Sequence, residues 1–207
     1  MMYIHGPGDG RQTACVLSAV YARWAANAVV EQVSDRPPNV CPLLRELCII
    51  RNDKTPLDAL QQWAPPMVDR LVDSKRDAAT TGRRLLAVGR RLAATVVADI
   101  AGQWPHAAAA LRREIEQLRS AETASEQLLA ALDAVHRHLS AVAYLSRFTV
   151  GDVRSGYASA VKIATCAAPE AESSIEIRAA SSSLACAMTD LDTPALDALI
   201  DLVLEIQ

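Results

Sequence analysis

The chain has 207 residues, of which 51% are hydrophobic but only 4% aromatic, and its formal net charge is −3. This length can bury a substantial core without disulfides or metals, and that core must be built from Ala, Leu, Val and Ile. The slightly negative charge argues against a general nucleic-acid binder, and no run reaches the roughly 18 consecutive apolar residues of a membrane span.

The N-terminal third predicts two helices separated by a proline turn. Residues 1–10 are rich in glycine and predict a flexible N-terminal segment, after which a helix capped by Asp9 is expected from about Arg11 to Val33. Two prolines within Ser34–Asn39 force a turn. Pro42 then suits the first turn of a short apolar helix.

The next helix has the clearest local start signal in the chain. Thr55 is expected to cap it, with Pro56 in the first helical position. Two consecutive prolines, Pro65 and Pro66, predict a break or kink, because a proline inside a helix removes a backbone hydrogen bond.

The middle of the chain predicts a long helix from Arg76 to about Gln103. Gly82 and Gly89 either weaken this helix or mark close contacts with neighbours. For residues 105–147 two arrangements stay open: a stop and restart at a capping box over Thr123–Glu126, or one continuous helix.

Residues Ser125–Phe148 predict the helix that organises the fold. Apolar residues recur there at steps of three and four, which is typical of a helix with one buried face: Leu128, Leu132, Val135, Leu139, Val142 and Leu145.

Three further helices are expected toward the C-terminus. One is capped by Thr149 and ends before Pro169, and the last is capped by Thr193. Ser174–Arg178 alternates like a strand, but the chain offers no partner strand, so a helix over Glu170–Met188 is favoured. The sequence therefore predicts an all-α fold: a single helical bundle of about seven to nine helices, without a sheet, forming one domain over residues 1–207.

Charge is distributed unevenly along the chain. Lys75–Arg119 holds nine basic residues against four acids, a net of +5, whereas Thr149–Gln207 holds three against nine, a net of −6. Solvated helix faces are the ordinary explanation. Complementary packing, within the chain or between two copies, is the more specific explanation. Packing between two copies predicts a homo-oligomer.

Two charged clusters are candidate interaction residues. The pairs Arg83-Arg84 and Arg90-Arg91 are seven residues apart, so equivalent positions stack on one helix face and suit an acidic protein surface. Asp197 and Asp201 share a face of the last helix; a solvated acidic stripe explains them better than a metal site does.

Cys15 is the candidate reactive thiol. It is expected near the start of a helix that follows a glycine-rich stretch, where backbone amides can stabilise a thiolate, and His5 is the nearest base in sequence. A small buried apolar residue is the far commoner role for such a cysteine. The five cysteines are odd in number and form no C-x-x-C pair, which favours reduced, mostly buried thiols and a cytoplasmic protein.

Neither a metal site nor a phosphate loop is predicted. His136 and His138 are two residues apart, so on a helix they point away from each other. The Gly6–Arg11 stretch lacks the Gly-Lys-Ser/Thr ending of a phosphate-binding loop.

Three stretches resemble alanine-rich, all-helical proteins of unknown function from high-GC actinobacteria and their phages. They are Asp9–Ala19, Val40–Leu44 and Asn52-Asp53, which together span about the first quarter of the chain. The resemblance implies a bacterial or phage cytoplasmic protein, in which Cys15, Cys41-Pro42 and Asn52-Asp53 form one structural unit. It implies no activity.

The leading functional hypothesis is a non-enzymatic protein-interaction module, an adaptor or a phage- or defence-associated binding protein acting through a helix face. Its partner would be another protein or a second copy, with no cofactor, no metal and no membrane. The alternatives are a small cysteine-dependent enzyme that uses Cys15 and a helical bundle that binds a small molecule.

Overall fold

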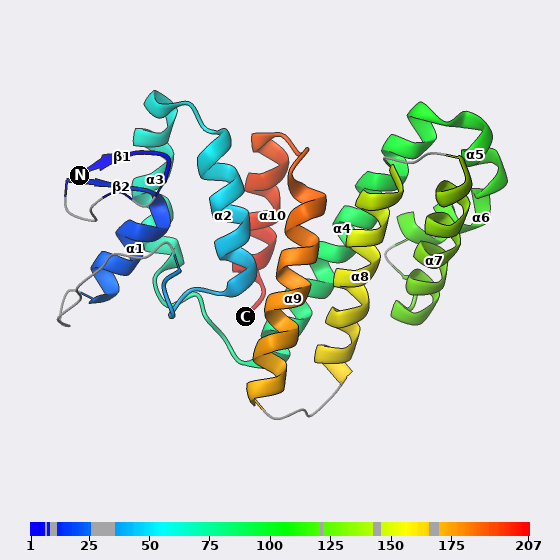
Figure 1. Ribbon diagram of the computed structural model, residues 1–207. Helices are drawn as coiled ribbons and strands as arrows, with labels where there is room; N and C mark the ends of the chain where they lie inside the picture. The colour runs from blue at the N-terminus through cyan, green and yellow to red at the C-terminus, as the bar shows by residue number, and fades with distance from the viewer. Residues whose placement is uncertain (7, 9–11, 26–35, 121, 143–145, 166–169) are drawn as a thin grey trace. The chain divides into compact units, whose positions relative to one another are not determined.

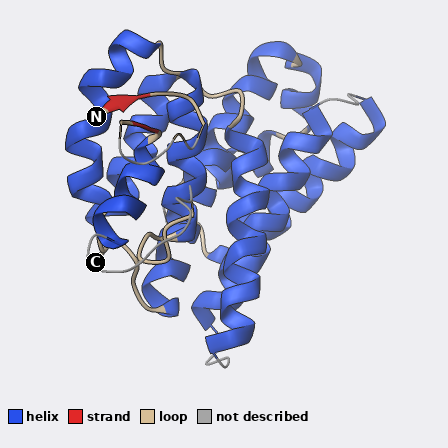
Figure 2. Cartoon of the chain, turned by 60° about the vertical axis from the view of Figure 1, so that its left-hand side comes forward, coloured by secondary structure: helices blue, strands red, loops and turns tan. Residues whose placement is uncertain are grey.

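A computed structural model describes the chain except for residues 7, 9–11, 26–35, 121, 143–145 and 166–169. The described residues form ten helices and two strands of two residues each (Figures 1 and 2). The predicted all-α fold is confirmed, although ten helices exceed the expected seven to nine. The expectation of no sheet needs correction, because β1 (Met2–Tyr3) and β2 (Thr13–Ala14) pair in parallel.

The chain divides into two compact units. Unit 1 comprises residues 1–77 and 190–207, and unit 2 comprises residues 78–189. Unit 1 is therefore discontinuous in sequence, since the last helix returns to the N-terminal part of the chain. That the whole chain is a single folding domain stays a prediction.

Unit 1 contains α1 (Val16–Trp24), α2 (Pro42–Lys54), α3 (Leu57–Leu71) and α10 (Thr193–Glu205). Helix α1 packs against α2 and α3, and α10 lies alongside α2 (Figure 1). Helix α10 buries one apolar face completely or almost completely, made by Leu196, Leu199, Ile200 and Val203. Burying four such side chains stabilises the helix by several kcal/mol, at roughly 1.5–3 kcal/mol each.

Two predicted helix starts in unit 1 are displaced. The first helix begins at Val16 rather than near Arg11, because Thr13 and Ala14 pair with β1 and Cys15 supplies the cap. Asp9 and residues 26–33 lie outside the described part of the chain. Asp192, not Thr193, caps α10 by accepting a bond from the Ala195 amide at 2.9 Å.

Helix α3 differs from the sequence prediction both at its N-terminus and at Pro65-Pro66. Pro56 is its N-cap, while the Thr55 hydroxyl donates to the Arg51 carbonyl at 2.5 Å. The helix also continues through Pro65 and Pro66 instead of breaking. Its buried face holds it to the core on both sides of the prolines, through Leu60, Ala64, Met67, Val68 and Leu71.

Unit 2 contains α4 (Ala78–Gln103), α5 (Pro105–Ala110), α6 (Arg112–Arg119), α7 (Ser125–Val142), α8 (Ser146–Thr165) and α9 (Glu170–Met188). The chain thus stops and restarts between α6 and α7, and helix is the correct assignment for 170–188. Within the described residues Leu128, Leu132, Val135 and Leu139 of the α7 stripe are buried as predicted. Val142 and Leu145 lie outside the side chains that the structure describes.

Helix α8, rather than α7, is the centre of unit 2. It packs against α4, α7 and α9, and Thr149, expected as a cap, lies inside it. Glycines allow the close approach: a Cβ on Gly89 of α4 would lie 2.8 Å from Tyr157 Cδ2, and one on Gly156 of α8 would lie 2.6 Å from Leu184 Cγ. The sequence left open whether Gly89 weakens the helix or marks a close contact with a neighbour, and the structure shows the close contact.

Candidate functional site

Cys15 caps α1 and is almost fully buried. Its Sγ accepts a hydrogen bond from the Ser18 amide at 3.4 Å and lies 3.3 Å from the Ser18 hydroxyl, and the residue is 6% exposed. His5, the nearest base in sequence, bonds through Nε2 to the Thr55 carbonyl at 2.8 Å. These contacts give the Cys15 and His5 side chains a structural role in unit 1.

Asp197 belongs to a cluster that fastens α10 to α2 and α3. Arg51 binds both of its carboxylate oxygens, with Nε–Oδ1 at 2.8 Å and Nη2–Oδ2 at 3.0 Å. The Trp63 indole N–H donates to Oδ1 at 3.2 Å, and the Arg51 guanidinium carbon lies 4.9 Å from the centre of the Trp63 ring. A planar, always charged guanidinium suits this combination of a two-pronged ion pair and a ring contact.

Asp201, one turn further along α10, forms a second and more exposed ion pair. It accepts from Arg70 Nη2 at 2.6 Å, with about half of each side chain in contact with solvent. The two carboxylates do share a helix face, as the sequence predicts. That face is not a simply solvated stripe, because both carboxylates have arginine partners within unit 1.

The pKa of Cys48 is raised well above its usual value. Burial is the main cause, and the negative charge of Asp197 adds to it. Burial and Asp69 similarly raise the pKa of Tyr3, and burial raises the pKa of Asp152. Each shift favours the neutral form, which is what desolvation does to an acidic group.

The two arginine pairs of α4 do not lie on one accessible face. Arg84 is buried, with 1% of its surface exposed, whereas Arg83 and Arg91 are exposed and Arg90 is half-buried. Arg83 donates to the Thr80 hydroxyl at 2.8 Å, one turn earlier in the same helix. A role for Arg83, Arg90 and Arg91 in partner binding stays a prediction, while Arg84 belongs to the interior.

No group of three His, Cys, Asp or Glu side chains that could hold a metal ion is found among the described residues. His136 packs beside α8, where a Cβ on Gly151 would lie 3.2 Å from its Cε1. Of the thiols that the structure describes, Cys15, Cys41 and Cys48 are buried and Cys186 is exposed. No helix within the described ranges is long and apolar enough to cross a bilayer.

A groove between α6 and α7 is a surface depression of unit 2. It has a volume of about 290 Å³ and is lined by Arg113, Glu114, Gln117, Gln127, Ala130 and Ala131; we refer to it as the α6–α7 groove. Arg113 and Gln117 are one turn apart on α6, and Gln127 and Ala131 are one turn apart on α7, so each pair shares a helix face.

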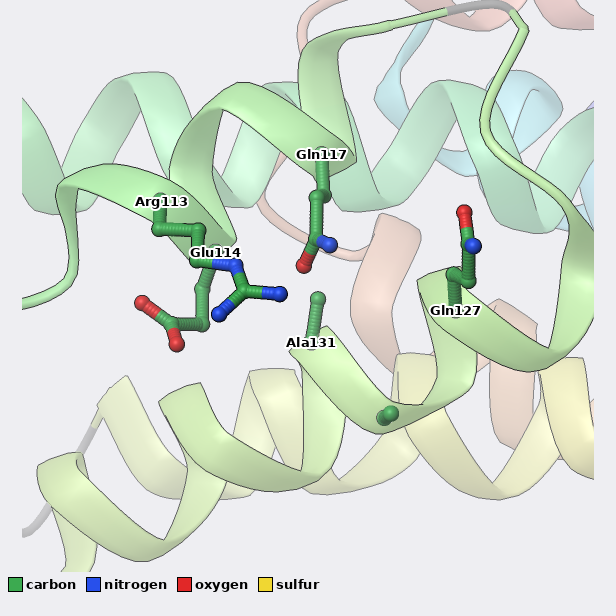
Figure 3. A pocket seen from close by; sticks show the side chains of 6 residues that line it. Arg113, Glu114, Gln117, Gln127 and Ala131 are labelled. Atoms are coloured by element: carbon green, nitrogen blue, oxygen red, sulfur yellow. The ribbon is translucent and has the colours of Figure 1, made fainter.

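Figure 3 shows how these side chains lie. The Arg113 guanidinium and the Gln117 amide converge above Ala131, while the Glu114 carboxylate points the other way. Hydrogen-bond donors and acceptors thus stand over the methyl group of Ala131. The groove is open and its lining mixes polar and apolar atoms, unlike an enclosed apolar chamber for a small molecule.

The groove was not predicted from the sequence, and neither was the Arg51–Trp63–Asp197 cluster. Polar residues four apart occur on most exposed helix faces, so Arg113 with Gln117 carries no distinctive signal. Arg51 and Asp197 are separated by 146 residues, and nothing local connects them. No protein-family model, curated protein or solved structure matches this chain.

Proposed function

We propose that the protein is a non-enzymatic interaction module and that the α6–α7 groove binds an acidic segment of a partner protein. The convergence of Arg113 and Gln117 over Ala131 carries this proposal. A guanidinium is the preferred protein group for a carboxylate, which it can bind through two parallel hydrogen bonds.

The glutamines of the groove suit the main chain of a bound segment. Unit 1 provides the precedent, because the Gln61 side chain accepts from the Tyr3 amide at 2.9 Å and donates to the Tyr3 carbonyl at 2.6 Å. A glutamine amide can therefore serve both backbone groups of one extended residue. Gln117 and Gln127 offer the same chemistry from the two helices that line the groove. The small, exposed Ala130 lets a backbone approach closely.

Charge favours an acidic partner over a basic one. Unit 2 contains twelve basic against ten acidic residues, a net of +2. On α6 itself Arg112, Arg113 and Arg119 are all exposed. Steering of an oppositely charged segment toward such a surface raises the association rate and fades with salt.

A second copy of the chain is one partner that could supply an acidic surface. Unit 1 contains nine basic against fourteen acidic residues, a net of −5. Self-association driven by this charge difference would weaken with salt. Light scattering that gives a monomer mass at both low and high salt would exclude the second copy as partner.

Peptide display tests the proposal and requires no identified partner. A library is selected on the wild-type protein and counter-selected on Ala130→Trp, in which an indole at an exposed position fills the groove. We expect the enriched peptides to contain Asp or Glu, to bind Arg113→Glu at least tenfold more weakly, and to bind Arg112→Glu nearly normally. Enriched peptides that bind the wild type, Ala130→Trp and Arg113→Glu equally would contradict the proposal.

A further inference from the structure

The α6–α7 groove contains two adjacent side chains of opposite charge that point in opposite directions. Arg113 and Glu114 are consecutive residues of α6, about 100° apart around the helix axis, and both line the groove. In Figure 3 the Arg113 guanidinium reaches over Ala131, whereas the Glu114 carboxylate points away from it. The two charges therefore do not pair with each other.

Neither charge is paired within the part of the chain that the structure describes. The ion pairs found there join other side chains, so that Asp133, Asp197 and Asp201 each have an arginine partner, whereas no described residue bonds to the Arg113 guanidinium or the Glu114 carboxylate. Glu114 also lacks a basic residue three or four positions away along the chain, where its neighbours are Ala110, Leu111, Gln117 and Leu118. A partner for the Glu114 carboxylate must therefore come from outside α6.

A structural role as a helix cap does not occupy Glu114. It is the third residue of α6 after the N-cap Leu111, a position from which a glutamate can accept a hydrogen bond from the N-cap amide. That amide is already used, because it donates to the Ala107 carbonyl at 3.0 Å. The first turn of a helix does favour a negative charge, but this preference leaves the carboxylate oxygens accessible to a partner.

We propose that Glu114 determines the specificity of the α6–α7 groove, which binds a partner segment with an acidic residue for Arg113 and a basic residue for Glu114. This inference rests on the proposed function and narrows the partner from any acidic segment to one that presents both charges in a fixed order. A segment with acidic residues alone would bring a second carboxylate to Glu114, and like charges brought together disfavour a complex. Because Glu114 is half-buried, water screens this repulsion less than it would at a fully exposed position.

Peptide selection on two forms of the protein tests this order of charges. The display library is selected on the wild type and, separately, on Glu114→Lys. We expect the wild type to enrich peptides that combine Asp or Glu with Lys or Arg at a recurring separation, and Glu114→Lys to enrich peptides with a second acid in place of that base. In fluorescence anisotropy, changing the base of a wild-type-selected peptide to Glu should weaken its binding to the wild type about fivefold and strengthen its binding to Glu114→Lys.

Glu116→Lys is the matched control, because it makes the same charge change at an exposed position of α6 outside the groove lining. It should leave the preference for the base unchanged, and Glu114→Gln should reduce that preference without reversing it, while circular dichroism confirms that the helices remain. Selected peptides that depend on Arg113 but contain no recurring base, or equal effects of Glu114→Lys and Glu116→Lys, would overturn the role of Glu114 alone. Peptides that bind Arg113→Glu as well as the wild type would instead contradict the proposed function, and this inference with it.

Discussion

Replacing Asp197 with Asn should destabilise unit 1 by about 2 kcal/mol. A buried ion pair that loses one partner typically costs about 3–5 kcal/mol, because the other charge is left without compensation. The Arg51 side chain is 11% exposed and that of Asp197 is 39% exposed, so water offsets part of this cost. Asparagine also keeps one oxygen that can accept from Trp63.

Asp201→Asn is the matched control, because it makes the same chemical change one turn along the same helix. Its ion pair with Arg70 is exposed, at 45% for the arginine and 53% for the aspartate. Exposed pairs contribute about 0.2–1 kcal/mol and are screened by salt. The losses of unfolding free energy caused by the two substitutions should therefore differ by at least about 1 kcal/mol. Only the smaller loss, that of Asp201→Asn, should shrink in concentrated NaCl.

Urea denaturation followed by tryptophan fluorescence and circular dichroism measures both changes, since Trp63 lies within the cluster. In a double-mutant cycle, Arg51→Met combined with Asp197→Asn should cost less than the sum of the single changes. Equal losses for Asp197→Asn and Asp201→Asn would refute the assignment of the Arg51–Asp197 pair as the one that fastens α10.

Three further predictions concern thiols and glycines. Site-resolved mass spectrometry after brief treatment with iodoacetamide should find Cys186 labelled well before Cys15; equal labelling would contradict the burial of the cap. Burial raises the folded pKa of Cys48 above its unfolded value. The contribution of the neutral Cys48 thiol to stability is therefore complete below the usual thiol pKa of 9.0 and is lost as pH rises further. The unfolding free energy should thus fall above pH 9 by up to about 1.4 kcal/mol per unit, with a shallower slope in Cys48→Ala. Gly156→Ala should destabilise unit 2 by about 2 kcal/mol or more, whereas Gly102→Ala, with no atom within 4 Å of the added Cβ, should stabilise it by up to about 1 kcal/mol; similar effects of the two changes in urea denaturation would show that the helix contact at Gly156 is not tight.

Local signals predicted most of the helices but located their ends less well. Apolar spacing identified α4, α7 and α10, because each buries an apolar face. Helix α9 was assigned for another reason, since its strand-like alternation had no partner strand in the chain. The predicted caps were wrong where a neighbouring residue took the cap position, or where the predicted residue used its side chain in another hydrogen bond. Thr55, for example, has the chemistry of a cap, but its hydroxyl is used by the Arg51 carbonyl. Pro65 and Pro66 did not end α3, because the buried face on both sides holds the helix together.

Tertiary neighbours could not be read from local patterns. The short sheet requires Met2–Tyr3 to meet Thr13–Ala14, and neither pair is long enough to alternate recognisably. Arg84 resembles Arg83 in sequence yet is buried, since its position on α4 faces the core. Asp197 has the sequence context of a surface acid, and only the fold brings Arg51 and Trp63 beside it.

The most direct test of the central claim is a charge exchange in the α6–α7 groove. An acidic peptide obtained by display is compared with a version in which its Asp and Glu residues are replaced by Lys, and both are titrated against wild type and Arg113→Glu by fluorescence anisotropy. If the groove binds an acidic segment, the wild type prefers the acidic peptide, and Arg113→Glu loses or reverses that preference. An unchanged preference in Arg113→Glu would contradict binding through this groove.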